Sequence, residues 1–285
     1  MANGLNKTKR RIASIESTEK TTKAMGLIAM VKLKRYLSSY ENQSLYSKEY
    51  LDLMSHLFAY DQESVSHYGR PNNKAKGTLY LVITSDLGLC GAYNSNIYKF
   101  VDRYVKEDDT LAPFGKKGIN HFKAINQKNL ELDFAKEGSL TDFAYLHELG
   151  EAIKEAFNQG KYKRICLIYT HYVNSLKAVP MLFQLLPVQI PMQPWEGEDS
   201  VKPEFDSSPK ELIHALMGDY LASQLYDRII ESNLSEQSMR RNAMDSANDN
   251  ADELLDKLRI EYNKARQGAI TQEITEVVSG ASVEQ

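Results

Sequence analysis

Residues 208–282 read SPKELIHALMGDYLASQLYDRIIESNLSEQSMRRNAMDSANDNADELLDKLRIEYNKARQGAITQEITEVVSGAS, a stretch without proline after Pro209. The Ser208 hydroxyl can cap free amides and the fixed φ of Pro209 suits a first helical turn, so a helix is predicted to begin here. At a rise of about 1.5 Å per residue, helix over most of this stretch would be on the order of 100 Å long. A chain of 285 residues cannot bury such a helix in one globule. The sequence therefore predicts a helix that needs a partner along its length.

The apolar residues in the second half of this helix indicate how it is paired. They recur at alternating steps of three and four residues, which is the spacing of a coiled-coil seam, and the opposite face is charged. After Ala265 the stripe resumes one residue out of phase, which is expected to change the supercoil locally. The predicted seam is Met244, Ala247, Ala251, Leu254, Leu258, Tyr262 and Ala265, followed by Ile270, Ile274, Val277 and Ala281.

A second long helix is predicted from Leu5 to about Tyr60, because all eight prolines lie between Pro71 and Pro209. Its stripe keeps the same rhythm and is interrupted by Glu19. Small residues in the middle of the stripe would let two helix axes approach closely, so the two ends of the chain are predicted to pair antiparallel. The stripe consists of Ile12, Ile15, Thr22, Gly26, Ala29, Leu33, Tyr36 and Tyr40.

Charge is consistent with this pairing. Residues 1–40 carry nine bases against two acids, whereas residues 207–285 carry fourteen acids against eight bases. A basic first helix is therefore expected to meet an acidic last helix. The alternative is a patch for nucleic acid or anionic lipid, which the net charge of −3 and the absence of aromatics among the bases disfavour.

The middle of the chain changes period. Buried strands are predicted at 78–85 and 164–172, a possible strand at 131–135, a further apolar segment at 181–188, and helices at 96–106 and 141–159. Strands that alternate with helices favour an open, mostly parallel, Rossmann-like sheet. The expected division is a coiled-coil helix at 1–60, an α/β domain at 76–202 and a second coiled-coil helix at 208–285.

Motifs for chemistry are sparse. The loop Asp86–Gly91 and the segment Gly115–Gly118 lack the spacing of dinucleotide or Walker phosphate loops, and the six histidines show no metal-ligand spacing. Cys90 and Cys166 suggest a reducing compartment more than a disulfide. No apolar run approaches the length of a membrane span, so a soluble chain is expected. The sequence predicts no catalytic, cofactor or metal site.

Three segments carry a family resemblance. They are Ile12–Ile15 with Thr18, Lys20, Thr22–Met25 and Lys32–Leu33, then Ser85–Asp86 with Gly88–Gly91 and Asn94–Asn96, and finally Tyr262–Gln267 with Ile270–Ala281. With these residues the chain closely resembles the gamma subunit of the F-type ATP synthase, and the resemblance covers both ends and the middle in order.

The resemblance implies a rotor shaft that couples rotation to ATP synthesis or hydrolysis and proton transport. In that family the terminal helices form a coiled coil inside a hexamer of alternating alpha and beta subunits, catalysis belongs to beta, and the globular part meets epsilon and the membrane c-ring. One copy per complex, no nucleic acid and a peripheral position on the cytoplasmic side of the membrane are implied. Contacts with beta are implied for Lys23, Met25, Arg266, Gln267 and Thr271.

Some positions depart from the family pattern. Leu87 and Arg241 stand where a cation and a methionine are common, Gly26 would cost about 1 kcal/mol against alanine in an exposed helix, and the tail from Ser282 is polar. These departures keep open the rotor of a specialised F-type-like ATPase that hydrolyses ATP for other work such as motility. A coiled-coil adaptor or a nucleic-acid-binding protein is the alternative of another class.

Overall fold

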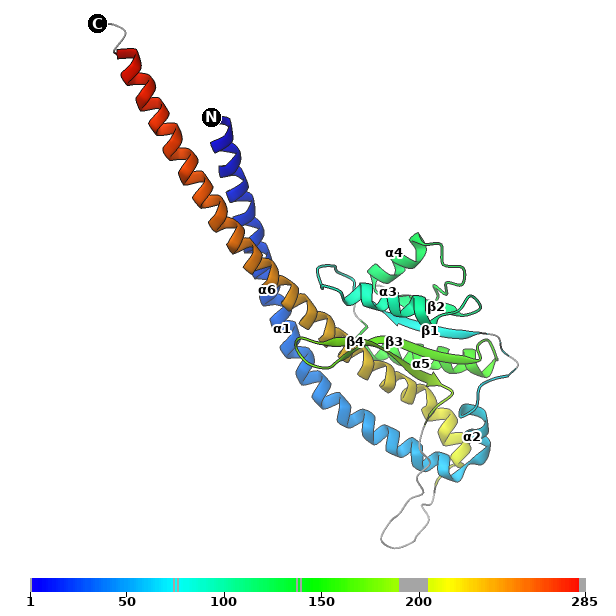
Figure 1. Cartoon of the computed structure of the whole chain (residues 1–285). Helices are drawn as coiled ribbons and strands as arrows, with labels where there is room; N and C mark the ends of the chain where they lie inside the picture. The colour runs from blue at the N-terminus through cyan, green and yellow to red at the C-terminus, as the bar shows by residue number, and fades with distance from the viewer. Residues whose placement is uncertain are drawn as a thin grey trace. The chain divides into compact units, whose positions relative to one another are not determined.

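The computed structural model describes residues 2–73, 75, 77–136, 138, 140–189 and 205–281. Its contacts divide the chain into a two-helix unit, Met1–Met30 with Arg240–Gln285, and an α/β unit, Val31–Met239. Two long helices, α1 (Ala2–Tyr60) and α6 (Pro209–Ala281), run through both units (Figure 1). Their bounds agree with the predicted helices within a few residues. The expected end of the α/β domain at 202 and the polar tail from Ser282 lie outside the described residues.

In the two-helix unit, α1 and α6 pair antiparallel, as predicted. The Thr22 hydroxyl hydrogen-bonds to the side-chain oxygen of Asn248, and Arg259 Nη2 lies 2.8 Å from Glu16 Oε1. From Thr22 to Glu16 the residue numbers fall on α1, whereas those of the contacted residues on α6 rise from Asn248 to Arg259, so the helices are antiparallel. Between the helices the chain buries Gly26, Ala29, Met244, Leu255 and Leu258.

The predicted seam is wrong at Leu254 and again after Tyr262, where Ala265, Ile270, Ile274 and Val277 are exposed. Leu254 is 40% exposed, whereas Leu255 is 2% exposed. The seam takes a four-residue step from Ala251 to Leu255 and a three-residue step to Leu258, where the prediction placed these two steps in the other order. Both orders fit a seven-residue repeat, and two adjacent leucines left the sequence pattern ambiguous at this point.

The α/β unit is built on a four-stranded sheet in the order β2-β1-β3-β4. The central β1 (Thr78–Ile83) pairs in parallel with β2 (Thr110–Phe114) and with β3 (Arg164–Tyr172). The last strand, β4 (Ala178–Leu186), pairs antiparallel with β3. The predicted open, mostly parallel sheet is thus confirmed, with one antiparallel edge.

Helices cover both faces of this sheet. Alternate residues of β1 separate the two cores: Leu79 and Leu81 pack in the larger cluster with α5 (Phe143–Asn158), α6 and the end of α1. Val82 packs in the smaller cluster with α3 (Tyr93–Tyr104) and α4 (Lys116–Ala124). The short α2 (Gln62–Tyr68) follows α1 and is capped by Asp61, whose carboxylate accepts hydrogen bonds from two amides of the first turn.

Three elements of this unit were not predicted: α2, β2 and α4. Strand β2 contains Pro113, which argues against a central strand, and β2 lies at the sheet edge, where a missing amide is tolerated. Helix α4 contains Gly118 and spans only nine residues. The predicted strand at 131–135 is wrong, because this segment is irregular and is flanked by single bridges from Leu130 to Leu111 and from Lys136 to Phe114.

Glycines allow a close contact between α5 and α6 in this unit. A Cβ on Gly150 of α5 would lie 2.4 Å from the backbone oxygen of Gly218 in α6. No side chain fits at that distance, so the two helices can cross this closely only because Gly150 has none. This contact holds α6 against the layer that covers the sheet.

Candidate partner-contact surface

The two expected contact residues of α1 lie in the two-helix unit on its exposed side. Lys23 forms an ion pair with Glu19 one turn earlier, and its side chain remains 54% exposed. The hydrogen bond between them lowers the pKa of Glu19 and raises the pKa of Lys23. Met25 is 37% exposed, which is unusual for a large apolar side chain that borders a helix seam. Both side chains are therefore accessible to a partner.

Met25 belongs to a larger exposed apolar surface. Leu27, Ile28 and Met30 are each at least half exposed, while Gly26 and Ala29 face α6. We call Met25, Leu27, Ile28 and Met30 the apolar collar. A helix that is apolar on every side is normally buried on every side. The collar therefore indicates that another protein covers α1 at this level.

The expected contact residues of α6 lie on its terminal segment. Arg266 and Gln267 are exposed, and the Thr271 hydroxyl donates a hydrogen bond of 2.9 Å to the backbone oxygen of Gln267. That bond occupies the hydroxyl donor of Thr271, whereas the exposed Arg266 and Gln267 keep their side-chain donors accessible to a partner. A guanidinium and an amide side by side can bind a carboxylate or a backbone carbonyl of another chain.

Beyond these residues α6 carries a second exposed apolar surface. Figure 1 shows α6 continuing past the N-terminal end of α1. Ile270, Ile274 and Val277 recur on one face of this extension and are 47%, 59% and 71% exposed. We call these three residues the tip stripe. Because α1 does not cover them, the tip stripe also requires a partner from another chain.

The structure does not bring the two groups of expected contact residues together. Lys23 lies at the level of Asp252, whose charge contributes to its raised pKa. Arg266 is fourteen residues further along α6, which corresponds to about 20 Å of helix. One small ligand cannot bridge that distance, whereas a large protein surface can contact both.

The ion pair between α1 and α6 has the opposite polarity to the expected pairing of a basic α1 with an acidic α6. The described residues contain one ion pair between α1 and α6 in this unit, from Glu16 to Arg259, so that the acid is on α1 and the base on α6. Both side chains are about half exposed, and such a pair is worth about 0 to 1 kcal/mol. Apolar and small residues of the seam, more than complementary charge, hold the pair together.

The loops after β1 and β2 are occupied by their own chain. Asp86 Oδ1 accepts hydrogen bonds from the amides of Lys116 and Gly138 at 2.9 and 3.1 Å. The amide of Gly118 donates to the Thr84 hydroxyl, where a Cβ on Gly118 would lie 2.5 Å away. A carboxylate of the chain thus takes the place that a bound phosphate would need at the start of α4.

Other reactive groups of the described part are buried or dispersed. Cys90 and Cys166 are free and buried, and burial raises the pKa of the Cys166 thiol to about 12. Within the described ranges, no three His, Cys, Asp or Glu side chains lie together in a way that could hold a metal ion. No helix in the same ranges is long and apolar enough to cross a membrane.

The family resemblance drew attention to five contact residues, and the sequence analysis missed most of the apolar collar. Leu27, Ile28 and Met30 are not on the seam, and attention to the seam alone left them unremarked. The signal was present, because residues 24–31 read AMGLIAMV without a polar side chain. The fold and these surfaces define an assembly subunit: a long helix pair, anchored by an α/β domain, that presents apolar faces to other chains.

Comparison with known proteins gives the family. The profile of the family described as ATP synthase matches residues 4–283. An ATP synthase gamma chain of Heliobacterium modesticaldum is 36% identical, over 98% of each chain. One of Malacoplasma penetrans is 37% identical, over 98% of this chain and 99% of the relative. The chain belongs to the ATP synthase gamma chain family.

Solved structures share the fold. The rotor of the Euglena gracilis mitochondrial ATP synthase superposes with a TM-score of 0.68 at 17% identity, covering 95% of this chain and all of that chain. The central stalk and c-ring structure of the Tetrahymena thermophila mitochondrial ATP synthase superposes with a TM-score of 0.57 at 25% identity, covering 80% of this chain and 99% of that chain.

Proposed function

We propose that this chain is the central rotor shaft of a rotary F-type ATPase, present in one copy inside a hexamer of alternating alpha and beta subunits. The observation that carries the proposal is the pair of apolar surfaces that the chain leaves uncovered: the apolar collar on α1 and the tip stripe on α6. A ring of partner subunits around the shaft would cover both surfaces at once. Family membership supplies the identity of the ring.

The shaft acts through its asymmetry. The apolar collar lies on α1 and the tip stripe on α6, so each of three equivalent catalytic sites meets a different face of the shaft. A face that contacts the closed form of a beta subunit better than the open form shifts that site toward closure. Turning the shaft moves this bias to the next site. The beta subunits carry out the chemistry, and the shaft supplies no catalytic group.

Five side chains make the proposed contacts with beta. Arg266 and Gln267, with Thr271 beside them, hydrogen-bond a beta subunit near the tip, and Lys23 and Met25 meet the moving part of beta below. A charge-assisted hydrogen bond is worth about 1.5 to 3 kcal/mol. That strength biases one site and still allows the contact to break during rotation, because arginine can release one carboxylate and bind the next.

The α/β unit forms the foot of the shaft. We assign residues 1–60 and 208–285 to the shaft and residues 76–202 to the foot, which binds the epsilon subunit and the c-ring. The c-ring lies in the membrane, and the chain accordingly sits at the cytoplasmic face as a peripheral protein. Torque passes between the foot and the hexamer through α1 and α6, which are continuous over 59 and 73 residues.

Purification of the chain with alpha and beta subunits from the same organism tests the proposal. We expect a complex with one copy of this chain per three beta subunits, measured by native mass spectrometry, and ATPase activity that resides in beta. The isolated chain is expected to bind no ATP in calorimetry with magnesium. A chain that stays separate from the hexamer, or that binds ATP stoichiometrically by itself, would contradict the proposal.

A further inference from the structure

Two neighbouring loops of the α/β unit carry an excess of positive charge. Residues 69–77 join α2 to β1 and residues 159–164 join α5 to β3; together they contain six cations and no acid. The amide of Asn72 donates to the backbone oxygen of Lys163 at 3.3 Å, and the amide of Lys163 donates to that of Gly77 at 3.0 Å. The two loops therefore lie side by side at the end of the sheet where β1 and β3 begin.

Part of this charge has no counter-charge among the described residues. Lys161 forms an ion pair with Glu131 at 2.7 Å. Arg70, Lys163 and Arg164 are exposed, and none of them forms an ion pair or a side-chain hydrogen bond within the part of the chain that the structure describes. Like charges in adjacent loops repel each other, so an anion bound from solution would stabilise this end of the sheet.

Arg70 lines an open pocket of about 640 Å³ between the end of α2 and the end of α5, which we call the loop pocket. That volume is within the range of about 300 to 1,000 Å³ found for small-molecule sites, and none of the lining residues is acidic. Beside Arg70 the pocket is lined by three asparagines, Asn72, Asn73 and Asn158. Asn158 Oδ1 already accepts a hydrogen bond from His67 Nε2 at 2.8 Å, which leaves mainly its N–H groups for a ligand.

The end of α5, which borders the loop pocket, satisfies its last turn with amides of its own chain. The amides of Gly160 and Lys161 donate to the backbone oxygens of Phe157 and Ala156 at 3.0 Å each. Gly160 has a φ of 74°, the left-handed conformation that such a helix end requires. These carbonyl groups are therefore occupied, and they repel an anion in the pocket less than free carbonyl groups at a helix end would.

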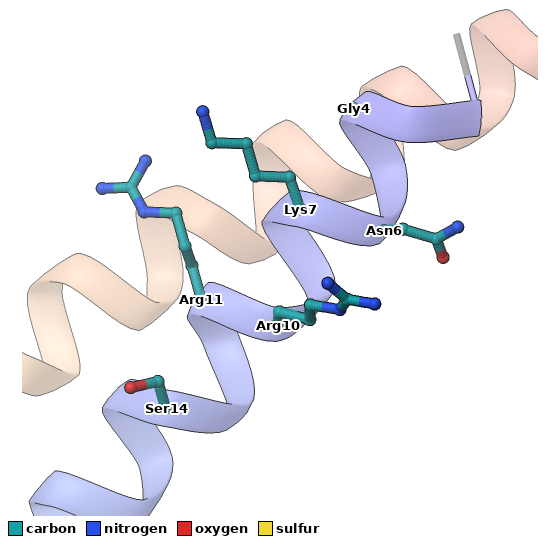
Figure 2. A pocket seen from close by; sticks show the side chains of 6 residues that line it. All are labelled: Gly4, Asn6, Lys7, Arg10, Arg11 and Ser14. Atoms are coloured by element: carbon teal, nitrogen blue, oxygen red, sulfur yellow. The ribbon is translucent and has the colours of Figure 1, made fainter.

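The loop pocket differs from another exposed basic group of the chain. Lys7, Arg10 and Arg11 come from one helix, α1, and Figure 2 shows Lys7 and Arg11 extending to one side of it and Arg10 to another. Side chains that diverge in this way cannot close around one small ligand. The loop pocket, in contrast, is lined by two segments that lie far apart in the sequence.

The donors of the loop pocket identify the class of anion. A guanidinium binds two oxygens of a phosphate in a planar fork, and amide N–H groups can donate to its other oxygens. A carboxylate has two oxygens and would leave the amides unused. A nucleic acid binds along an extended basic groove, whereas the described cations gather at one pocket. The loop pocket therefore favours a single phosphate group.

We propose that the loop pocket binds a phosphate group, held by Arg70 and by the charge of Lys163 beside it. Free phosphate compounds and the headgroups of anionic phospholipids both present this group. The inference goes beyond the proposed function, because the binding requires this chain alone. A bound phosphate would link the loop after α2 to the end of α5 and would stabilise the folded α/β unit, since it binds only the folded state.

The test is a titration of the full chain with inorganic phosphate at constant ionic strength, followed by NMR of the amides in the two loops. We expect saturable shifts there, and at least tenfold weaker binding for Arg70→Gln/Lys163→Gln, because charge-assisted hydrogen bonds are lost. The matched control is Lys99→Gln/Arg103→Gln, which removes the same charge from exposed positions on α3 and should keep the wild-type affinity. Acetate should bind at least tenfold more weakly than phosphate, because it has fewer oxygens to accept from the pocket.

Vesicles distinguish the two sources of the phosphate group. Binding of the wild-type chain to phosphatidylglycerol vesicles but not to phosphatidylcholine vesicles, lost only in Arg70→Gln/Lys163→Gln, would assign a lipid headgroup. Binding of inorganic phosphate without vesicle binding would assign a free phosphate compound. The proposal is overturned if neither binds, if the two double variants respond equally, if acetate binds as tightly as phosphate, or if DNA binds at these residues and phosphate does not. Entry into the alpha-beta hexamer tests the proposed function separately.

Discussion

Gly26 of α1 lies against Met244 of α6, so that a Cβ on Gly26 would stand 3.5 Å from the Met244 Cβ. That distance is ordinary van der Waals contact, and an alanine therefore fits without moving either helix. The position is buried in the seam, where the predicted stripe placed it. Gly26 allows close packing here but is not required for it.

We therefore expect Gly26→Ala to stabilise the two-helix unit by about 1 kcal/mol, because alanine has the higher helix propensity. Amide hydrogen exchange of residues 20–30 should slow by about fivefold. Gly26→Leu should have the opposite effect, since its larger side chain has no space against Met244. Faster exchange in Gly26→Ala would show that the helices are closer than the structure indicates.

The corrected seam makes a prediction about two adjacent leucines. Leu255→Ala should destabilise the two-helix unit by about 2 kcal/mol or more, because it removes a buried side chain. Leu254→Ala should destabilise the unit clearly less than Leu255→Ala does, because Leu254 is 40% exposed and lies beside the seam. Hydrogen exchange over residues 240–265 measures both, and equal effects, or a larger effect at Leu254, would restore the register first predicted.

The sequence predicted the parts of the fold that depend on repetition. Long proline-free stretches with a stripe of three- and four-residue steps identify α1, α6 and their antiparallel pairing, and runs of β-branched residues identify β1 and β3. Elements whose residues disfavour their own secondary structure were missed. Strand β2 contains Pro113, which is compatible with a strand only because β2 is at the sheet edge. Edge position is a property of the whole sheet and cannot be seen in five residues.

The contact surface could be predicted only in part, because the exposed apolar residues can be recognised only once the side of α1 that faces α6 is known. Residues such as Arg266 were found through resemblance, whereas Leu27 and Ile28 required knowledge of which side of α1 faces α6. Once the seam is known, every apolar residue outside it becomes informative. The ambiguity between Leu254 and Leu255 shows that the seam itself needs the partner helix to be fixed.

A buried carboxyl group in the α/β unit predicts a dependence of stability on pH. Glu231 of α6 accepts a hydrogen bond from the amide of Tyr172 and contacts His171, and burial raises its pKa above the ordinary value of 4.5. The folded state therefore holds this proton more tightly than the unfolded state. The resulting contribution to stability is present below pH 4.5 and is lost as the pH rises through the folded pKa.

Glu231→Gln removes this titration. The variant should therefore gain stability relative to wild type between pH 4.5 and pH 7, measured as an increase in its relative free energy of unfolding in urea titrations. Glu253→Gln is the control of opposite sign, because the hydrogen bond to Lys257 lowers the pKa of Glu253. A difference between Glu231→Gln and wild type that is independent of pH would show that Glu231 is not desolvated.

The contacts near the tip predict an effect on turnover. Arg266→Ala with Gln267→Ala should lower the ATPase turnover of the reconstituted complex and reduce its yield, because a charge-assisted contact with beta is lost. Lys257→Ala is the control, since Lys257 is exposed and pairs with Glu253 of its own helix at 2.5 Å. Equal turnover and equal yield for the two variants would place the coupling contacts elsewhere.

Rotation of the chain within the complex tests the central claim most directly. The hexamer is fixed to a surface, and a gold particle is attached to a cysteine introduced at Leu176, an exposed position on the turn between β3 and β4. With ATP present, we predict that the particle turns in one direction in three steps per revolution, one step for each beta subunit. ATP hydrolysis at the full rate with a stationary particle would contradict the account.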